Sequence, residues 1–248
     1  MSAWFDRFFE GLYARVLLGQ FDEAGTLSQA GAVKRLLRAR KGQRVLDIPC
    51  GTGRLTVPLA RMGLVMTGVD LTPAYIRRAR RVARKSRMDV RFIQGDMREI
   101  DFESEFDAAF NWFGSFGYFS DADNLAFARR VFQALKPGGR FLVDGPHKSW
   151  LLAHWRERRE SNIAGVRILQ SSRWDARRLR AVTTWTMCRG RLRECHRSSM
   201  RIYDAAEMRA LLREAGFRDV RLYDGWRPVG PFTRHSRRMI AVGTRPRL

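Results

Sequence analysis

Apolar positions recur with helical spacing along the first forty residues, and a different pattern follows. Residues 4–13 carry aromatic and leucine side chains three to four positions apart, and residues 32–39 form a second apolar helical face. Beyond Gln43, short apolar runs predict strands at 44–48, 64–69, 90–94, 106–110 and 140–143. The segments between them predict helices at 54–61, from Pro73 onward, and at 121–135. Strands and helices alternating at this pace predict right-handed βαβ units and a parallel sheet.

The pattern changes again after His147. A helix is predicted at 151–158, and three strands follow at 167–173, 179–187 and 191–203. The connections between these strands are short, so we expect them to pair as an antiparallel meander. The chain then continues with a helix at 205–215 and with two strands at 218–223 and 239–242.

Composition narrows the class of protein. The chain has 248 residues, 45% of them hydrophobic, which is enough for a sizeable core. It contains no run of 18 apolar residues and no stretch typical of a cleavable leader, so we expect a cytoplasmic protein without a membrane span. The three cysteines, Cys50, Cys188 and Cys195, are too few and too far apart for a disulfide framework or a zinc site.

The charge balance is strongly basic. Lys and Arg number 47 against 25 Asp and Glu, for a net charge of +22, a balance that favours polyanionic partners. Only five of these cations are lysines, and the arginines are spread over the whole chain, as on the solvated faces of an arginine-biased protein. The densest run, residues 77–87, falls on one predicted helix. We therefore favour an ordinary basic surface and keep a nucleic-acid surface as the alternative.

A glycine-rich loop stands where open α/β sheets bind ligands, between the first strand and a helix. Its sequence is Asp47-Ile48-Pro49-Cys50-Gly51-Thr52-Gly53. A dinucleotide fingerprint would need a third glycine where Thr56 stands, and the Gly-Lys-Ser/Thr ending of a phosphate loop is missing. The carboxylate of Asp47 would repel a pyrophosphate but could hold an ammonium group. The loop therefore favours a ligand with an amino-acid end.

Two further acids end the next two predicted strands. Asp70, after the second strand, can accept both hydroxyls of an unphosphorylated ribose. Asp96, after the third strand, can accept a hydrogen bond from an exocyclic adenine amine, with the Met97 backbone N–H beside it. Each Asp alone is more often a turn or cap residue. Three of them on consecutive strand ends instead indicate one ligand with ammonium, diol and amine groups.

These segments resemble the successive motifs of class I S-adenosylmethionine-dependent methyltransferases. The likeness is carried by residues 45–53, 67–70, 94–97 and 135–141, and it covers about residues 40–146. Residues 110–119 and 217–242 are similar to a bacterial small-molecule branch of that family. The resemblance implies an α/β, Rossmann-like sheet of seven strands with only the last one antiparallel. Pro49 departs from the family pattern, which more often has Gly or another small residue there.

The resemblance also implies S-adenosylmethionine as the cofactor. Asp47 and the backbone of Gly51 and Gly53 would hold its methionine end, Leu71 would pack on the adenine, and Asn111 would lie near the sulfonium. The full set of cofactor-binding residues predicted in this way is Asp47, Ile48, Pro49, Cys50, Gly51, Gly53, Asp70, Leu71, Gly95, Asp96, Met97, Asn111 and Trp112. No metal site is predicted.

Aromatic side chains are the candidates for stabilising a sulfonium cation and lining the substrate site. Trp112 and Tyr118 carry polar tips that need partners, so we favour them over plain core residues. Tyr13 and Phe113 are further candidates. Tyr118 is also a candidate catalytic residue.

Histidines supply the candidate general base that an amine, hydroxyl or carbon acceptor requires. His147 follows the fifth strand, at the ligand-binding edge, and we predict that it is catalytic, with a surface role as the alternative. His196 on the meander faces either substrate or solvent, and Tyr203 is a weaker alternative as base.

The predicted organisation has three parts. Residues 1–40 form a helical lid, residues 41–147 with 204–248 form the cofactor domain, and residues 148–203 form a substrate lid or a dimer surface. The predicted reaction transfers a methyl group in line to N, O or C of a small molecule, which would be acidic if the cavity is basic. RNA or protein methylation is the alternative, and the exposed strand edges of the insertion favour a homodimer.

Overall fold

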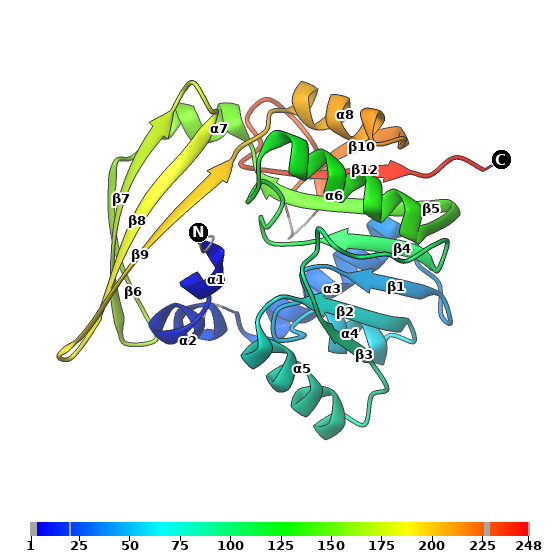
Figure 1. The fold of residues 1–248 in the computed structure, drawn as a ribbon, viewed down its shortest axis with the longest axis horizontal. Helices are drawn as coiled ribbons and strands as arrows, with labels where there is room; N and C mark the ends of the chain where they lie inside the picture. Colours follow the sequence, from blue (N-terminus) through cyan, green and yellow to red (C-terminus); the bar gives the residue numbers. More distant parts are fainter. Residues whose placement is uncertain (1–3, 20, 226–228, 248) are drawn as a thin grey trace.

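The computed structural model describes residues 4–19, 21–225 and 229–247, and it arranges them around two sheets (Figure 1). Within these residues the larger sheet has eight strands in the order β11-β10-β12-β5-β4-β1-β2-β3. Neighbouring strands from β3 to β5 are parallel, whereas β12 runs antiparallel to both β5 and β10. The strands are β1 (Arg44–Asp47), β2 (Val65–Asp70), β3 (Arg91–Gln94), β4 (Phe106–Asn111), β5 (Leu135–Pro146), β10 (Arg218–Asp224), β11 (Gly230–Pro231) and β12 (Arg238–Thr244).

This topology confirms the expected Rossmann-like sheet with an antiparallel last strand. The prediction of seven strands omits β11, which has only two residues and pairs antiparallel with β10 at the sheet edge. Gly230 and Pro231 carry no alternating apolar pattern, so the sequence gives no signal for this strand. The fifth strand is also longer than predicted, because β5 already starts at Leu135.

Burial explains why the predicted strand segments form a sheet. Val45 and Leu46 on β1 are both fully buried, yet they face opposite sides because side chains alternate along a strand. Leu46 packs with α6 and α8, and Val45 packs with α3 and α4. The covering helices are α3 (Glu23–Leu37), α4 (Thr56–Arg61), α5 (Pro73–Lys85), α6 (Asp121–Ala134) and α8 (Ala205–Glu214). With both faces covered, polar chemistry is confined to the ends of the strands.

The N-terminal region corrects one helix boundary. Helices α1 (Phe5–Phe8) and α2 (Gly11–Gly19) precede α3, which starts at Glu23 rather than at residue 32. Its N-cap is Asp22, whose side chain accepts a hydrogen bond from the Gly25 N–H at 2.6 Å. The first turns of α3 contain mostly small and polar residues, and this composition hides the helix from an apolar-periodicity search.

The second sheet is an insertion between β5 and α8. It is a fully antiparallel meander in the order β6-β7-β8-β9, and α7 (Lys148–Ala153) precedes it. The predicted helix at 151–158 is wrong in its second half, because Arg158 starts a fourth strand. That edge strand is polar and largely exposed, so only its pairing with β7 reveals it. The strands are β6 (Arg158–Ile163), β7 (Val166–Asp175), β8 (Arg180–Arg189) and β9 (Leu192–Arg201).

Helices α1 and α2 lie between the two sheets (Figure 1). Leu12 and Val16 of α2 pack against Val166, Ile168 and Met187 on the inner face of the inserted sheet. The Leu12 N–H also donates to the Glu194 carboxylate on β9 at 2.8 Å. The N-terminal helices are thus docked on the insertion, and together they cover one end of the larger sheet.

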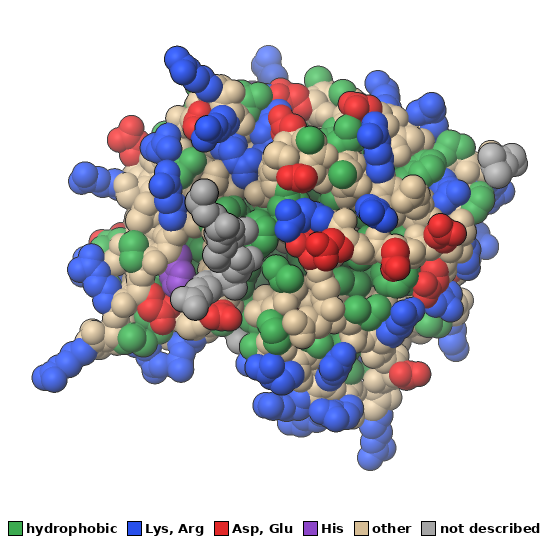
Figure 2. Space-filling model, viewed as in Figure 1, with side chains coloured by type: hydrophobic (Ala, Val, Ile, Leu, Met, Phe, Trp, Pro, Cys, Tyr) green, Lys and Arg blue, Asp and Glu red, His purple; other side chains and the backbone are tan. Residues whose placement is uncertain are grey.

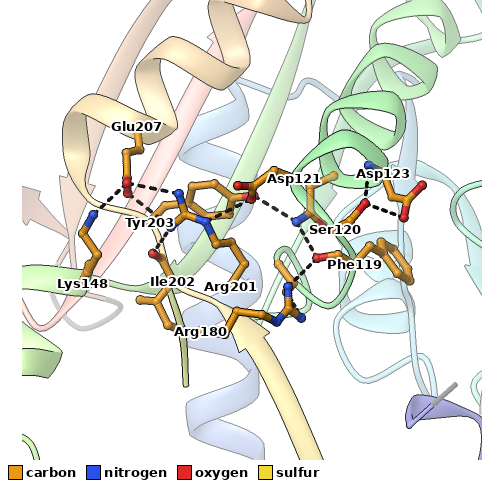
Figure 3. Close-up of polar contacts among 12 residues, drawn as sticks. Phe119, Ser120, Asp121, Asp123, Lys148, Arg180, Arg201, Ile202, Tyr203 and Glu207 are labelled. Carbon is orange, nitrogen blue, oxygen red and sulfur yellow. Dashed lines mark hydrogen bonds and ion pairs between the residues drawn. The ribbon is translucent and has the colours of Figure 1, made fainter. Parts of the chain in front are cut away.

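Two arginines join the inserted sheet to the larger domain (Figure 3). Arg201, at the end of β9, is only 6% exposed, and its guanidinium pairs with Asp121 at 3.0 Å and with Glu207 at 3.1 Å. Arg180 on β8 donates to the backbone carbonyls of Tyr118 at 2.9 Å and Phe119 at 2.7 Å. Because the Arg201 guanidinium is itself buried, its two partially exposed partners compensate its charge and are expected to stabilise the junction.

Gly117 lies where β9 passes closest to the loop after β4, and its replacement tests this junction. A Cβ at Gly117 would lie 2.3 Å from the Arg201 carbonyl oxygen, and the residue has φ +109°. We expect Gly117→Ala to lower the free energy of unfolding by about 2–4 kcal/mol, measured by urea denaturation.

Gly165→Ala is the matched control for this substitution. Gly165 also has positive φ, at +73°, but no atom lies within 4 Å of its Cβ position. Backbone strain alone should then cost about 1 kcal/mol. Equal destabilisation by the two variants would contradict the close approach at Gly117.

Candidate functional site

A cavity of about 360 Å³ opens at the carboxyl ends of β1 and β2. Its lining comes from four parts of the chain: the loop after β1, the ends of β2 and β3, the segment after β4, and the N-terminal helices with the inserted sheet. Residues far apart in sequence, such as Phe5, Asp70 and Trp185, therefore face one space. Ligand sites in open α/β sheets occupy this position.

The glycine loop forms the floor of the cavity. The Cys50 N–H donates to the Val69 carbonyl at 2.8 Å, which ties the loop to the end of β2. Gly51 has φ +55°, and no atom lies within 4 Å of the position that its Cβ would take. Gly53 has a different role, because its Cβ position is 3.2 Å from the Ala79 Cβ and from the Phe92 ring. Gly51 thus leaves room for a ligand, whereas Gly53 permits close packing beneath the loop.

Asp70 joins the loop to the end of β2. Its two carboxylate oxygens accept from the Gly51 N–H and the Thr72 N–H, each at 2.8 Å. Burial raises the pKa of Asp70 above its ordinary value, although these two donors favour the anion. The carboxylate also lines the cavity, where its remaining lone pairs can accept hydroxyl donors.

Asp47 is the more perturbed of the two acids. It is 3% exposed, and the Thr56 hydroxyl donates to its carboxylate at 2.6 Å. Burial raises the pKa of Asp47 to about 8, against the opposing effects of Thr56 and the Arg54 cation. A cationic ligand group beside this carboxylate would favour its ionised form.

Asp96 is held by a neighbour in the sequence. The Arg98 guanidinium pairs with its carboxylate at 2.6 Å, and the Arg98 backbone N–H donates to it at 2.8 Å. Burial acts to raise the pKa of Asp96, but the Arg98 hydrogen bonds and charge outweigh it, and the pKa is lowered overall. Asp96 is therefore an anion at neutral pH with a fixed orientation at the cavity wall.

Aromatic side chains close the cavity opposite these acids. The Phe9 ring lies 5.9 Å from the Tyr118 ring, and the Tyr13 ring lies 5.7 Å from the Trp185 ring. The Tyr75 hydroxyl donates to the Phe9 carbonyl, which attaches the N-terminal helices to α5. Burial raises the pKa of Tyr118 to about 12 and also raises the pKa of Tyr13. Both phenols are therefore neutral hydrogen-bond donors at physiological pH.

Most of the predicted site residues meet in this cavity. Those that line it are Tyr13, Asp47, Pro49, Cys50, Gly51, Asp70, Leu71, Gly95, Asp96, Met97, Trp112, Phe113 and Tyr118. Ile48, Gly53, Asn111, His147 and His196 do not line it.

The residues outside the lining have other contacts. Asn111 is fully buried and donates to the Ile48 carbonyl at 2.9 Å. His147 is also buried; its Nδ1 lies 3.0 Å from the Ser236 carbonyl oxygen, and its ring packs on Phe232. His196 pairs with Glu194 at 3.3 Å. For His147, these contacts are typical of a structural histidine rather than of a base that faces a substrate.

Several lining residues escaped prediction from the sequence. Phe5 on α1, Phe9 just after α1 and Tyr75 on α5 line the cavity, although none of them was a candidate site residue. Trp185 and Met200 lie on neighbouring strands of the insertion and share its inner face. The alternation of side chains along these strands could have indicated that both residues share one face of the sheet. Only the position of the inserted sheet shows that this face meets the cavity.

The described residues form neither a metal centre nor a membrane span. Among them, no three His, Cys, Asp or Glu side chains are grouped as ligands for a metal ion. None of their helices combines the length and the apolar character needed to cross a bilayer.

Comparison with known proteins shows which family part of the chain resembles. Residues 45–139 match the methyltransferase domain family. The chain is 37% identical over 112 residues to YqeM of Bacillus subtilis (strain 168), which is named as a methyltransferase, and the match spans 44% of each chain. It is 47% identical over 66 residues to a ubiquinone biosynthesis O-methyltransferase of Azorhizobium caulinodans, or 27% of this chain and 26% of that one. Sequence similarity thus covers less than half of these relatives.

The fold is shared over a much greater length. An S-adenosylmethionine-dependent methyltransferase from Clostridium acetobutylicum superposes with a TM-score of 0.79, covering 95% of this chain and 96% of that one at 16% identity. Residues 45–139 therefore resemble the methyltransferase domain family, and the chain as a whole shares its fold with this S-adenosylmethionine-dependent enzyme.

The raised pKa of Asp47 predicts a pH dependence of stability. Folding raises the pKa of this carboxyl, so the folded state favours its protonated form. Its contribution to the free energy of unfolding is therefore fully present below the pKa of the unfolded chain, near pH 4, and is lost as the pH rises toward 8. We expect the unfolding free energy of the wild type to fall between pH 4 and pH 8 more steeply than that of Asp47→Asn, by up to about 1.4 kcal/mol per pH unit.

Urea denaturation at a series of pH values measures this difference. Asp89→Asn, at an exposed carboxylate, is the control and should retain the slope of the wild type. Parallel pH profiles for the wild type and Asp47→Asn would contradict the assignment.

Proposed function

We propose that this protein transfers a methyl group from S-adenosylmethionine to a small-molecule acceptor. The observation that carries the proposal is the convergence of Asp47, Asp70 and Asp96 on one cavity floored by Gly51. Asp47 would hold the ammonium group of the cofactor, Asp70 its ribose hydroxyls, and Asp96 its adenine amine. When bound, the cofactor supplies a methyl group that is already activated by a positive sulfur.

The residues present fit this cofactor. The Cβ positions of Gly51 and Gly95 are open, with nothing nearer than 3.9 Å at Gly95, so the backbone can approach a ligand closely.

The protein's own contribution would be alignment and exclusion of water. Phe5, Phe9, Tyr118 and Trp185 form an aromatic wall that can stabilise a cation and keep the reacting groups dry. Among the described lining residues there is no histidine or lysine. The acceptor would therefore bring its own nucleophilic lone pair. We assign Tyr118 the role of a neutral donor in the site, and the predicted role of His147 as general base is not part of this mechanism.

The lining favours an uncharged, planar acceptor over an acidic one. Arg54 is the only cationic side chain among the described lining residues, and its guanidinium donates to Gln29 at 2.9 Å and lies 4.1 Å from the Phe21 ring centroid. The remaining charged lining residues are carboxylates, which would repel an acid. A relative named for ubiquinone biosynthesis is consistent with an aromatic acceptor.

RNA or protein methylation has less support. Basic side chains on the face in Figure 2 are dispersed and lie among acidic ones, without a continuous stripe. The cavity is covered by the N-terminal helices, as suits a small acceptor. We further propose that α1 and α2, together with residues 148–203, serve as lids over the cofactor domain. The predicted lid at residues 1–40 is too long, because α3 packs on the larger sheet as part of its core. Dimerisation through the insertion stays a prediction.

Calorimetric titration with S-adenosylmethionine tests the cofactor assignment. We expect saturable binding to the wild type and an affinity about tenfold to hundredfold lower in Asp70→Ala, because charge-assisted hydrogen bonds to the ribose are lost. Asp101→Ala, at an exposed position, is the control and should bind like the wild type. Absence of binding to the folded wild type would refute the proposed function.

Matched naphthalene probes test the acceptor class in the presence of S-adenosylhomocysteine. We expect 2-naphthol to bind more tightly than 2-naphthoate, because the wall is aromatic and its charges are mostly negative. Trp185→Ala should weaken 2-naphthol binding about tenfold through lost stacking and leave binding of S-adenosylhomocysteine unchanged.

Trp174→Ala on the neighbouring strand is the control, since Trp174 packs on Trp155 outside the cavity. Preference for the naphthoate, or binding of methyl glucoside without binding of 2-naphthol, would contradict an aromatic uncharged acceptor.

A further inference from the structure

A second concavity lies between the end of α3 and strand β10, and its volume is about 810 Å³. It shares no described lining residue with the cavity above the glycine loop. Five arginines from four elements line it: Arg35 and Arg38 at the end of α3, Arg140 on β5, Arg209 on α8 and Arg221 on β10. We call it the arginine groove.

The positive charge of the groove is not balanced locally. Among its described lining residues there is no acidic side chain, and none of the five arginines forms an ion pair with another described residue. Burial lowers the pKa of Arg140, and the like charges of Arg38 and Arg221 lower it further, whereas Tyr223 and Asp219 act to raise it. The guanidinium groups thus repel one another, and an anion in the groove would relieve that repulsion.

The absence of ion pairs is not peculiar to the groove. Arg81 and Arg84 on α5 also form no ion pair with another described residue, but they occupy exposed positions of a single helix. The groove differs because guanidinium groups from four elements gather in one concavity whose described lining has no acid.

The groove also has features suited to an organic anion. Its floor contains Leu36, Leu222 and Phe232, and Tyr223 adds a hydroxyl group. Arg140 uses one N–H to hold the Leu36 carbonyl at 3.3 Å, and a guanidinium has five such donors. Planar guanidinium groups bind phosphate oxygens in bidentate fashion.

We propose that the arginine groove is a binding site for a short chain of phosphates, free or carried by a nucleotide. Its bounded shape favours such a ligand over an extended nucleic acid, which needs a continuous basic track. The site is separate from the methyl-transfer cavity and does not rest on the proposed function.

Calorimetric titration with inorganic tripolyphosphate tests the groove directly. The test variant is Arg38→Gly/Arg221→Gln. Arg38 is suited to this change because it ends α3 with φ +52°, a conformation that glycine adopts without strain. We expect one saturable site for tripolyphosphate in the wild type. In the variant we expect the affinity to be at least about tenfold lower and the melting temperature to be unchanged or raised.

The matched control is Arg81→Gln/Arg84→Gln on α5, which removes the same charge at two exposed positions. It should bind tripolyphosphate like the wild type, and saturating S-adenosylhomocysteine should leave the affinity unchanged. Equal weakening by the two double variants would show diffuse attraction and overturn the proposal. Competition with S-adenosylhomocysteine would place the anion in the other cavity and would overturn the proposal. Binding of long RNA without binding of tripolyphosphate would indicate a nucleic-acid surface and would also overturn the proposal.

ATP and tripolyphosphate distinguish the two sources of the phosphate chain. Tighter binding of ATP than of tripolyphosphate, lost in the same variant, would support a nucleotide whose base uses the apolar floor. Equal or weaker binding of ATP would support the free phosphate chain.

Discussion

Burial of the parallel strands under helices on both faces is the constraint on which this structure depends. Because β1, β4 and β5 are covered on each side, the polar groups that a ligand needs can stand only where the strands end. Asp47 and Asp70 stand there. The Gly51 N–H donates to Asp70 and holds the glycine loop against the end of β2, while the Thr72 N–H donates to the other carboxylate oxygen. The same bonds keep the carboxylate oriented toward the cavity, so the packing of the sheet and the geometry of the site have one cause.

The other half of the cavity depends on a different set of contacts. The N-terminal helices are held by Glu194 from the inserted sheet and by Tyr75 from α5, and they bring Phe5, Phe9 and Tyr13 over the strand ends. The inserted sheet is in turn held by Arg180 and Arg201, which bind the segment after β4 and the ends of two helices. The aromatic wall of the cavity therefore rests on contacts between distant parts of the chain, whereas its floor rests on contacts between neighbouring strands of one sheet.

This division explains which predictions succeeded. Strands with strong apolar runs, such as 44–48 and 106–110, were placed well, because they are buried on both faces. The edge strand β6, which is polar and exposed, was not predicted, and its first residue was placed at the end of a helix, since its structure comes from pairing with β7. The start of α3 was missed for a related reason, because its first turns are small and polar. Among the site residues, those of the glycine loop and the strand ends were found from motifs, while Trp185 and Met200 were not.

The sequence by itself determined the class of fold and the residues on the floor of the cavity, because a strand, a glycine loop and a strand-ending acid each lie within a few consecutive residues. Tertiary structure alone decided which aromatic residues line the opposite wall, since Phe5 and Trp185 come from elements more than a hundred residues apart. It also decided the setting of His147, whose Nδ1 lies against the Ser236 carbonyl, and the gathering of arginines from four elements into one groove. Such long-range contacts depend on how the elements pack, so no pattern within a short stretch of sequence predicts them.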